Sequence, residues 1–157
     1  MVFDNPYKIN NSLIKQQDDI MHAIEMLNYS MFIDIGASED TNVNFFKMIN
    51  GTQFSPLMAA AAKGSEEIVR LILLNKTLDI NLENEQGVNA FWTACFFGHG
   101  NIMRTLADHG IDILSRNKEN VNVLHLATEK NHIKIVEMLL QSSFSLTDET
   151  NTGMTAL

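Results

Sequence analysis

The sequence has little of what disulfide-bonded and metal-binding proteins depend on. Only one of its 157 residues is a cysteine, Cys95, so no internal disulfide can form. No Cys-x-x-Cys or His-Glu-x-x-His pattern occurs, so the sequence predicts no zinc site. No apolar run approaches the roughly 18 residues that span a bilayer, and the first residues hold no apolar core of a secretion signal. We therefore expect a cytoplasmic protein without membrane insertion.

Positive charge is scarce as well. The 11 Lys and Arg residues are outnumbered by 19 Asp and Glu residues, which gives a formal net charge of −8. Nucleic acids and anionic membranes are bound through basic patches, and no run of Lys or Arg occurs in this chain. The sequence therefore predicts that no nucleic acid is a partner.

Catalytic motifs are also lacking. Gly98-His99-Gly100 is too short for a phosphate-binding loop, and no Gly-Lys-Ser or Gly-Lys-Thr follows it. The motifs of kinases, hydrolases and dehydrogenases are absent. We therefore expect no enzymatic activity, no catalytic residue, no cofactor and no bound metal.

What the sequence does contain is an internal repeat. Equivalent positions recur at intervals of 34, 33 and 33 residues, at Pro56, Ala90, Val123 and Ala156. Each full unit reads as a short helix, a turn and a second helix with apolar residues at i, i+1, i+4 and i+5. These residues are Ile68, Val69, Ile72 and Leu73; Ile102, Met103, Leu106 and Ala107; and Ile135, Val136, Leu139 and Leu140. Stacked helix pairs can bury such a stripe, whereas one pair alone cannot.

The first helix of each unit opens on a recognisable motif. The segment 55–60, Ser-Pro-Leu-Met-Ala-Ala, resembles the Thr-Pro-Leu-His-x-Ala opening of an ankyrin repeat, as does 123–127, Val-Leu-His-Leu-Ala. Gly64, Gly98 and Asn131 share the position where that family turns between its helices, a turn that favours Gly or Asn. Over about residues 50–157 the chain is identified as a member of the ankyrin repeat family.

The resemblance implies an all-α ankyrin-repeat solenoid, built of helix-turn-helix units with β-turn fingers and closed by an N-terminal helical cap. We expect repeats at about 50–83, 84–116 and 117–149, and a partial repeat at 150–157. Residues 1–49 are expected to form a tail and a helical capping segment, with a helix from Ser12 to about Leu27 and a helix or turn at 42–50. The first helix is either a degenerate repeat or a separate cap. Because the last repeat is incomplete, we expect the chain to be a fragment of a longer protein.

The resemblance also implies where a partner protein binds, because ankyrin repeats use their finger tips and the exposed ends of their first helices. The middle repeat has two adjacent aromatic residues, Phe96 and Phe97, where the flanking repeats have Ala-Lys and Glu-Lys. Aromatic residues surrounded by charge are typical of binding hot spots. Alternatively, one of them packs under the fingers. The candidate partner-binding residues are Phe54, Lys63, Glu85, Gln86, Val88, Phe96, Phe97, Lys118, Glu119, Val121, Glu129 and Lys130.

Other conspicuous side chains are given structural roles. His99 and His132 lie at the turn, where the family uses His structurally, and His125 is expected to bridge neighbouring loops. Cys95 has small residues at the equivalent positions, Ala61 and Thr128, which indicates a buried, inert thiol rather than a nucleophile activated by His99. Phe91 and Trp92 are predicted to lie in the core.

Together these features predict a scaffold that binds another protein and catalyses nothing; homo-oligomers are not implied. Two alternatives remain open at this point. The chain is either a regulatory segment of a larger enzyme or channel, or a structural subunit of a large assembly. Fold alone does not distinguish them.

Overall fold

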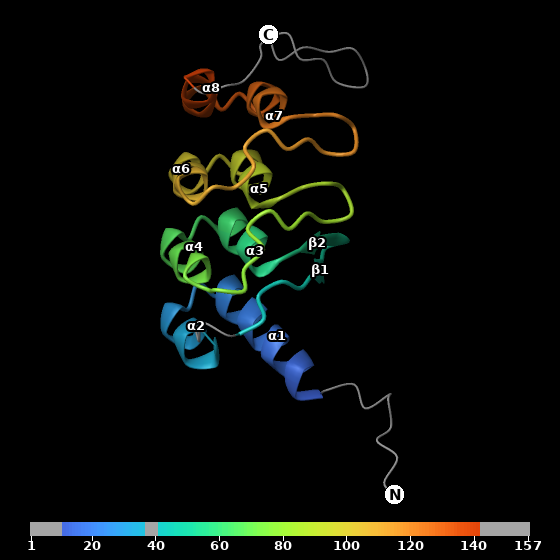
Figure 1. The fold of residues 1–157 in the computed structure, drawn as a ribbon, viewed down its shortest axis with the longest axis vertical. Helices are drawn as coiled ribbons and strands as arrows, with labels where there is room; N and C mark the ends of the chain where they lie inside the picture. The colour runs from blue at the N-terminus through green and yellow to red at the C-terminus, as the bar shows by residue number, and fades with distance from the viewer. Residues whose placement is uncertain (1–10, 37–40, 142–157) are drawn as a thin grey trace, which may run out of the picture.

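The computed structural model describes residues 11–36 and 41–141; the tail at 1–10 and the partial repeat at 150–157 lie outside this range. Within it, helices alternate between an inner row and an outer row (Figure 1). The inner helices are α1 (Asn11–Glu25), α3 (Pro56–Lys63), α5 (Ala90–Phe96) and α7 (Val123–Glu129). The outer helices are α2 (Tyr29–Gly36), α4 (Glu66–Leu73), α6 (Gly100–Asp108) and α8 (Ile133–Leu140). The predicted ankyrin solenoid is confirmed.

One hairpin accompanies the helices. Strand β1 (Lys47–Ile49) pairs antiparallel with β2 (Thr52–Phe54). The two turn residues, Asn50 and Gly51, have φ angles of 50° and 80°, as a tight Asn-Gly hairpin requires. The expected helix or turn at 42–50 is therefore wrong for 47–49, because the turn chemistry outweighs the apolar content of that short run.

Each inner helix of the full repeats begins at a side-chain cap. Ser55, Asn89 and Asn122 accept hydrogen bonds from the backbone N–H groups three residues further on, at distances of 3.2, 3.0 and 2.9 Å. These caps satisfy donors that have no partner inside the helix. At Asn122 the cap is reciprocal, because the Asn122 N–H donates to His125 Nδ1 at 3.4 Å. His125 thus makes this contact within its own repeat.

The predicted apolar stripe supplies the outer helices' part of the core. Its first, second and third positions are buried in α4 and α6. The fourth position, i+5, lies about 140° around the helix from the first, at the edge of the stripe. There Leu73 is half-buried, Ala107 is exposed and Leu140 is 41% exposed. The i+5 residues therefore mark the boundary of the core.

The N-terminal helices continue the same stacking. Helix α1 packs against α2 and α3, and α2 also contacts α4, as α4 contacts α6 further along (Figure 1). Helix α1 buries four residues, Ile20, Met21, Ala23 and Ile24. The predicted helix from Ser12 is present, but it ends at Glu25.

Successive repeats are joined by histidines that lie over glycines. His99 Nε2 lies 3.2 Å from the Ala62 carbonyl oxygen of the preceding repeat, and His132 Nε2 lies 3.3 Å from that of Phe96. A Cβ atom at Gly64 would lie 2.8 Å from His99 Cε1, and one at Gly98 would lie 3.0 Å from His132 Cε1. The structural role predicted for both histidines is confirmed. Each ring has space only because the residue beneath it, at the turn of the preceding repeat, is a glycine.

The turn glycines provide the first prediction. Gly64 and Gly98 have φ angles of 75° and 80°, and Gly110 has 82° but no atom within 4 Å of an added Cβ. We expect Gly110→Ala to lower the free energy of unfolding by about 1 kcal/mol, through backbone strain alone. Gly64→Ala should cost distinctly more, roughly 2–3 kcal/mol, because the new methyl also displaces the His99 ring. Urea denaturation measured by circular dichroism tests this. Equal losses at both sites would contradict the histidine–glycine packing.

Candidate partner-binding surface

Two adjoining hollows lie between the finger row and the inner helices. One has a volume of about 410 Å³ and is lined by β2, the second finger and α5. The other has a volume of about 780 Å³ and is lined by α1, β2 and α3. They share Thr52, Phe54 and Phe97, so they form one continuous depression. We call this depression the aromatic groove, after Phe54, Trp92, Phe96 and Phe97.

Three aromatic rings form a cluster along the groove. The Trp92 and Phe96 rings stack with centroids 5.8 Å apart and an interplanar angle of 17°. Phe97 meets Phe96 edge to face at 5.1 Å, and Lys130 Nζ lies 4.4 Å from the Phe96 centroid. Phe96 is 38% exposed and Phe97 is 47% exposed, so neither is packed away under the fingers. Adjacent exposed aromatic rings of this kind are typical of interaction surfaces.

Trp92 is placed differently from Phe91, although both were predicted to be core residues. Phe91 is buried, but Trp92 is half-buried and lines the groove. The Trp92 indole Nε1 is itself buried and has no acceptor among the described residues. A buried donor left unpaired costs about 1–3 kcal/mol. In the flanking repeats, the positions equivalent to Trp92 hold Met58 and His125. Because one of these is apolar and the other polar, the position is not restricted to core residues.

The structure brings half of the predicted binding residues to the groove. Phe54, Lys63, Gln86, Val88, Phe96 and Phe97 line it. The others lie beside it on the fingers or helix ends: Glu85, Lys118, Glu119, Glu129 and Lys130 are exposed, and Val121 is half-buried. Val88 is only 8% exposed, because its N–H donates to Asn84 Oδ1 and its side chain joins the core, so it offers a partner little surface.

Several lining residues could not be found from the repeat alignment. The larger hollow is partly walled by Ile24, Glu25 and Met26 at the end of α1. That helix matches the repeat register poorly, so its position relative to the fingers could not be predicted. Asn117 lines the smaller hollow but is not among the predicted binding residues.

The fingers are held beside the groove by hydrogen bonds from amide side chains and from the backbone. Asn84 Nδ2 donates to the Gln53 carbonyl oxygen at 3.0 Å, and the Lys118 N–H donates to the Gln86 carbonyl oxygen at 3.0 Å. Gln53 Nε2 also donates to Glu85 Oε1 at 2.8 Å. Each finger is therefore hydrogen-bonded to the one before it.

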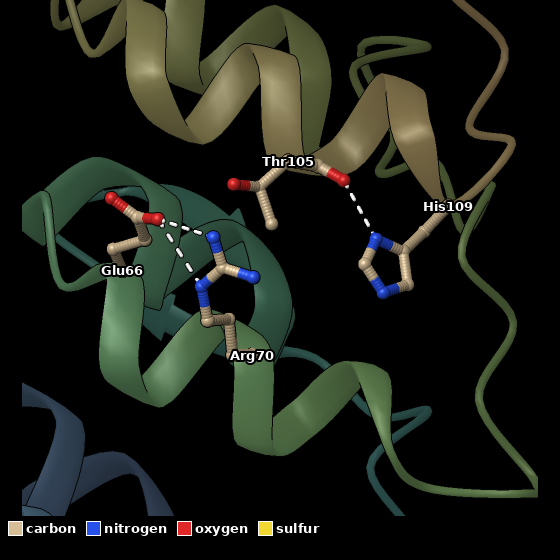
Figure 2. Close-up of polar contacts among 4 residues, drawn as sticks. All are labelled: Glu66, Arg70, Thr105 and His109. Carbon is tan, nitrogen blue, oxygen red and sulfur yellow. Dashed lines mark hydrogen bonds and ion pairs between the residues drawn. The ribbon is translucent and has the colours of Figure 1, made fainter.

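The outer helices present a different surface, in which polar contacts stay within one helix (Figure 2). Arg70 pairs with Glu66 on α4, four residues away, with Nη2 to Oε1 at 2.6 Å. His109 Nδ1 lies 2.7 Å from the Thr105 carbonyl oxygen at the end of α6. An exposed ion pair of this kind contributes little to stability. Near the N-terminal ends of α6 and α8 lies a hollow of about 450 Å³ whose lining includes Arg104 and Lys134. Unlike the aromatic groove, it is not lined by Phe, Tyr or Trp.

The chemistry of the remaining candidates is limited by burial. Cys95 is fully buried, and its thiol lies 3.4 Å from the Val123 carbonyl oxygen. Burial raises the pKa of the Cys95 thiol to about 12. His99 contacts the Ala62 carbonyl oxygen. Within residues 11–36 and 41–141, no group of three or more His, Cys, Asp or Glu side chains could hold a metal ion. In the same ranges no helix is both long and apolar enough to cross a membrane.

Comparison with known proteins identifies the repeats. A family described as "Ankyrin repeats (3 copies)" matches residues 20–117, and one described as "Ankyrin repeat" matches residues 120–151. The first match begins within α1, ahead of the first expected repeat.

Three relatives illustrate the context of such segments. The chain is 32% identical over 71% of its length to the rat ankyrin repeat and SAM domain-containing protein 6. It is 28% identical over 75% of its length to the Caenorhabditis elegans ankyrin repeat and KH domain-containing protein mask-1. It is 35% identical over 57% of its length to a rice protein named as a probable E3 ubiquitin-protein ligase, XBOS32. The chain spans only 12%, 4% and 18% of these relatives.

The buried thiol gives the second prediction. Cys95 should not react with Ellman's reagent at pH 8 in the folded protein and should react at once in urea. Between pH 9, near the ordinary pKa, and about 12, the unfolded thiol has lost its proton while the folded one retains it. The free energy of unfolding should therefore fall as pH rises through this window, and fall less steeply in Cys95→Ala. Rapid labelling of the folded protein would contradict this account.

Proposed function

This chain belongs to the ankyrin repeat family, whose repeats are protein-interaction modules, and we propose that it binds a partner protein through the aromatic groove and the finger tips, without catalysing a reaction. The other predicted residues beside the groove, on the fingers and helix ends, form the polar rim of the same interface. In this proposal the partner is a protein, not a nucleic acid, and the interface does not require a second copy of the chain.

The exposed pair Phe96 and Phe97 is the observation that carries this proposal. Equivalent positions in the flanking repeats hold Ala62-Lys63 and Glu129-Lys130, which are ordinary surface residues apart from the half-buried Ala62. The two aromatic side chains at the end of α5 expose apolar surface, and a partner can bury this surface. The charged residues around them exclude water at the edge of such a contact, as in interface hot spots.

The rigidity of the fingers supports binding by a preformed surface. Because the fingers are hydrogen-bonded to one another, little conformational entropy is lost when a partner docks. The groove walls also come from five different elements, α1, β1, β2, α3 and α5, which are packed together without the partner.

The absence of catalysis is proposed for this chain alone. The single cysteine is buried and protonated, and the described residues hold no cluster of three or more side chains that could bind a metal ion. Some relatives are named as E3 ubiquitin-protein ligases, and the chain spans less than a fifth of each. A second candidate function therefore follows: the chain is the partner-binding segment of a larger protein.

We further infer that α1 and α2 form the first repeat of the array rather than a separate cap. Their packing on α3 and α4 follows that of the later pairs, and the three-copy family match begins at residue 20. Repeats would then occupy about residues 11–49, 50–83, 84–116 and 117–149.

An affinity capture experiment tests the proposed function. Wild-type protein and a Phe96→Ala/Phe97→Ala double variant are used as baits in a lysate of the source cell, and captured proteins are identified by mass spectrometry. We expect the double variant to lose at least tenfold of the captured partner, because truncating hot-spot residues typically costs about 2 kcal/mol or more.

The matched control is Leu74→Ala/Leu114→Ala. These leucines are 70% and 52% exposed and line neither hollow, so the control removes a similar exposed apolar area elsewhere. It should capture the partner like wild type. A partner retained equally by the folded groove variant would place the binding site on another face.

A further inference from the structure

The smaller hollow of the aromatic groove has an unusual lining. Its floor is apolar, formed by Phe54, Met58, Val88, Trp92 and Phe96. Its polar lining residues are Thr52, Asn84, Gln86, Thr93 and Asn117, and none of the lining residues is charged. The occupant of this hollow is therefore uncharged at the point of contact. An acidic partner is further disfavoured by the net charge of −8.

A cation is disfavoured for a separate reason. The Phe96 ring at this hollow could attract one, but Lys130 already lies over it at 4.4 Å from its centroid. An arginine or lysine from a partner would have to displace a cation of the chain itself.

Three of the side-chain donor groups at the hollow have no acceptor in the part of the chain that the structure describes. The Trp92 indole N–H is buried and unpaired. The side-chain amide of Gln86 and the Nδ2 group of Asn117 have no hydrogen bond to a described residue, although Asn117 Oδ1 accepts from Glu119 and Val121. The lining therefore offers donors to which acceptors on a partner can bind.

Backbone conformations differ in how many free acceptors they present. The carbonyl groups of an α-helix are bonded within the helix, apart from its last turn. A β-strand requires an edge that supplies donors and acceptors in alternation. On β2, the nearest strand, the Gln53 carbonyl oxygen already accepts from Asn84. A polyproline II helix has no internal hydrogen bonds, so all of its carbonyl groups are available, and it is known to dock in aromatic-lined grooves.

The spacing of the hollows fits the same conformation. They adjoin through Thr52, Phe54 and Phe97 and lie against successive inner helices, α3 and α5. Packed helices are about 8–10 Å apart. A polyproline II helix advances about 9 Å in three residues and then presents a side chain on the same face. Side chains at positions i and i+3 can thus enter neighbouring hollows.

We propose that the aromatic groove binds a proline-rich segment of the partner in the polyproline II conformation, with apolar residues at i and i+3 in the two hollows and a backbone carbonyl accepting from Trp92 Nε1–H. This rests on the proposed function, since it names the segment that the same surface takes. Because Nε1 is covered in the free protein, a lining side chain moves slightly as the carbonyl approaches.

Selection of peptides tests the proposal without knowledge of the partner. The probe is a phage-displayed library of random dodecapeptides, selected on the immobilised full chain and, in parallel, on the Phe96→Ala/Phe97→Ala variant. We expect enrichment on wild type of peptides with prolines and two apolar residues three positions apart, and no such enrichment on the variant. Enrichment of helical peptides with i, i+4 apolar spacing, or of acidic peptides, would overturn the proposal.

The role of the indole is tested with one selected peptide, synthesised with a fluorescein label. Binding should change the emission of Trp92, the single tryptophan of the chain, because its N–H gains an acceptor. Fluorescence anisotropy should show about three- to tenfold weaker binding to Trp92→Phe, which keeps a ring but lacks the donor. Leu74→Ala should bind like wild type, and unchanged binding by Trp92→Phe would exclude the indole contact.

The two levels of inference can fail separately. If no peptide is enriched above an unrelated immobilised protein, yet the groove variant loses a captured partner from lysate, the groove binds a folded surface and the polyproline II assignment is wrong. If neither peptide nor partner depends on Phe96 and Phe97, the proposed function of the groove fails as well.

Discussion

The packing of a histidine ring over the turn glycine of the preceding repeat is the contact on which the rest of the structure depends. His99 lies over Gly64 and His132 over Gly98, and each ring also reaches a carbonyl oxygen of the earlier inner helix. Glycine serves twice here, because its positive φ closes the turn and its missing side chain admits the ring. This contact sets how far each helix pair is shifted along the stack, and therefore how the inner helix ends and the fingers line up beside one another.

In a regular stack of this kind, a distinctive binding surface arises where residues depart from the repeat pattern. The helix ends form a row in which Lys63 and Lys130 flank Phe96 and Phe97. Trp92 breaks the pattern in the same way, since the equivalent positions hold Met58 and His125. All three aromatic residues belong to the middle repeat, where neighbours on both sides supply walls for a groove. Conserving the scaffold and varying a few residues at one level is sufficient to create a distinctive surface on a common fold.

The sequence was most informative where a physical requirement repeats. The 33-residue period, the buried stripe and the turn residues Gly64, Gly98 and Asn131 could all be predicted, because burial and positive φ restrict those positions to few residue types. The hairpin at Lys47–Ile49 was missed because its register depends on Asn50 and Gly51 rather than on apolar spacing. The groove was only partly predictable. The exposure of Phe96 and Phe97 and the burial of Val88 depend on packing between repeats, as does the Trp92 N–H, which has no acceptor among the described residues. Helix α1 has no repeat register from which its wall of the groove could be placed.

Site-specific photo-crosslinking would test most directly whether the groove is the surface that meets a partner. A benzophenone side chain would be placed at position 97 in the groove and, in a separate preparation, at position 74 at the end of α4, which lines neither hollow, and each protein would be irradiated with its captured partner. The account predicts a covalent adduct from position 97 and none from position 74. An adduct from position 74 alone would contradict it and would transfer the interface to the outer helices.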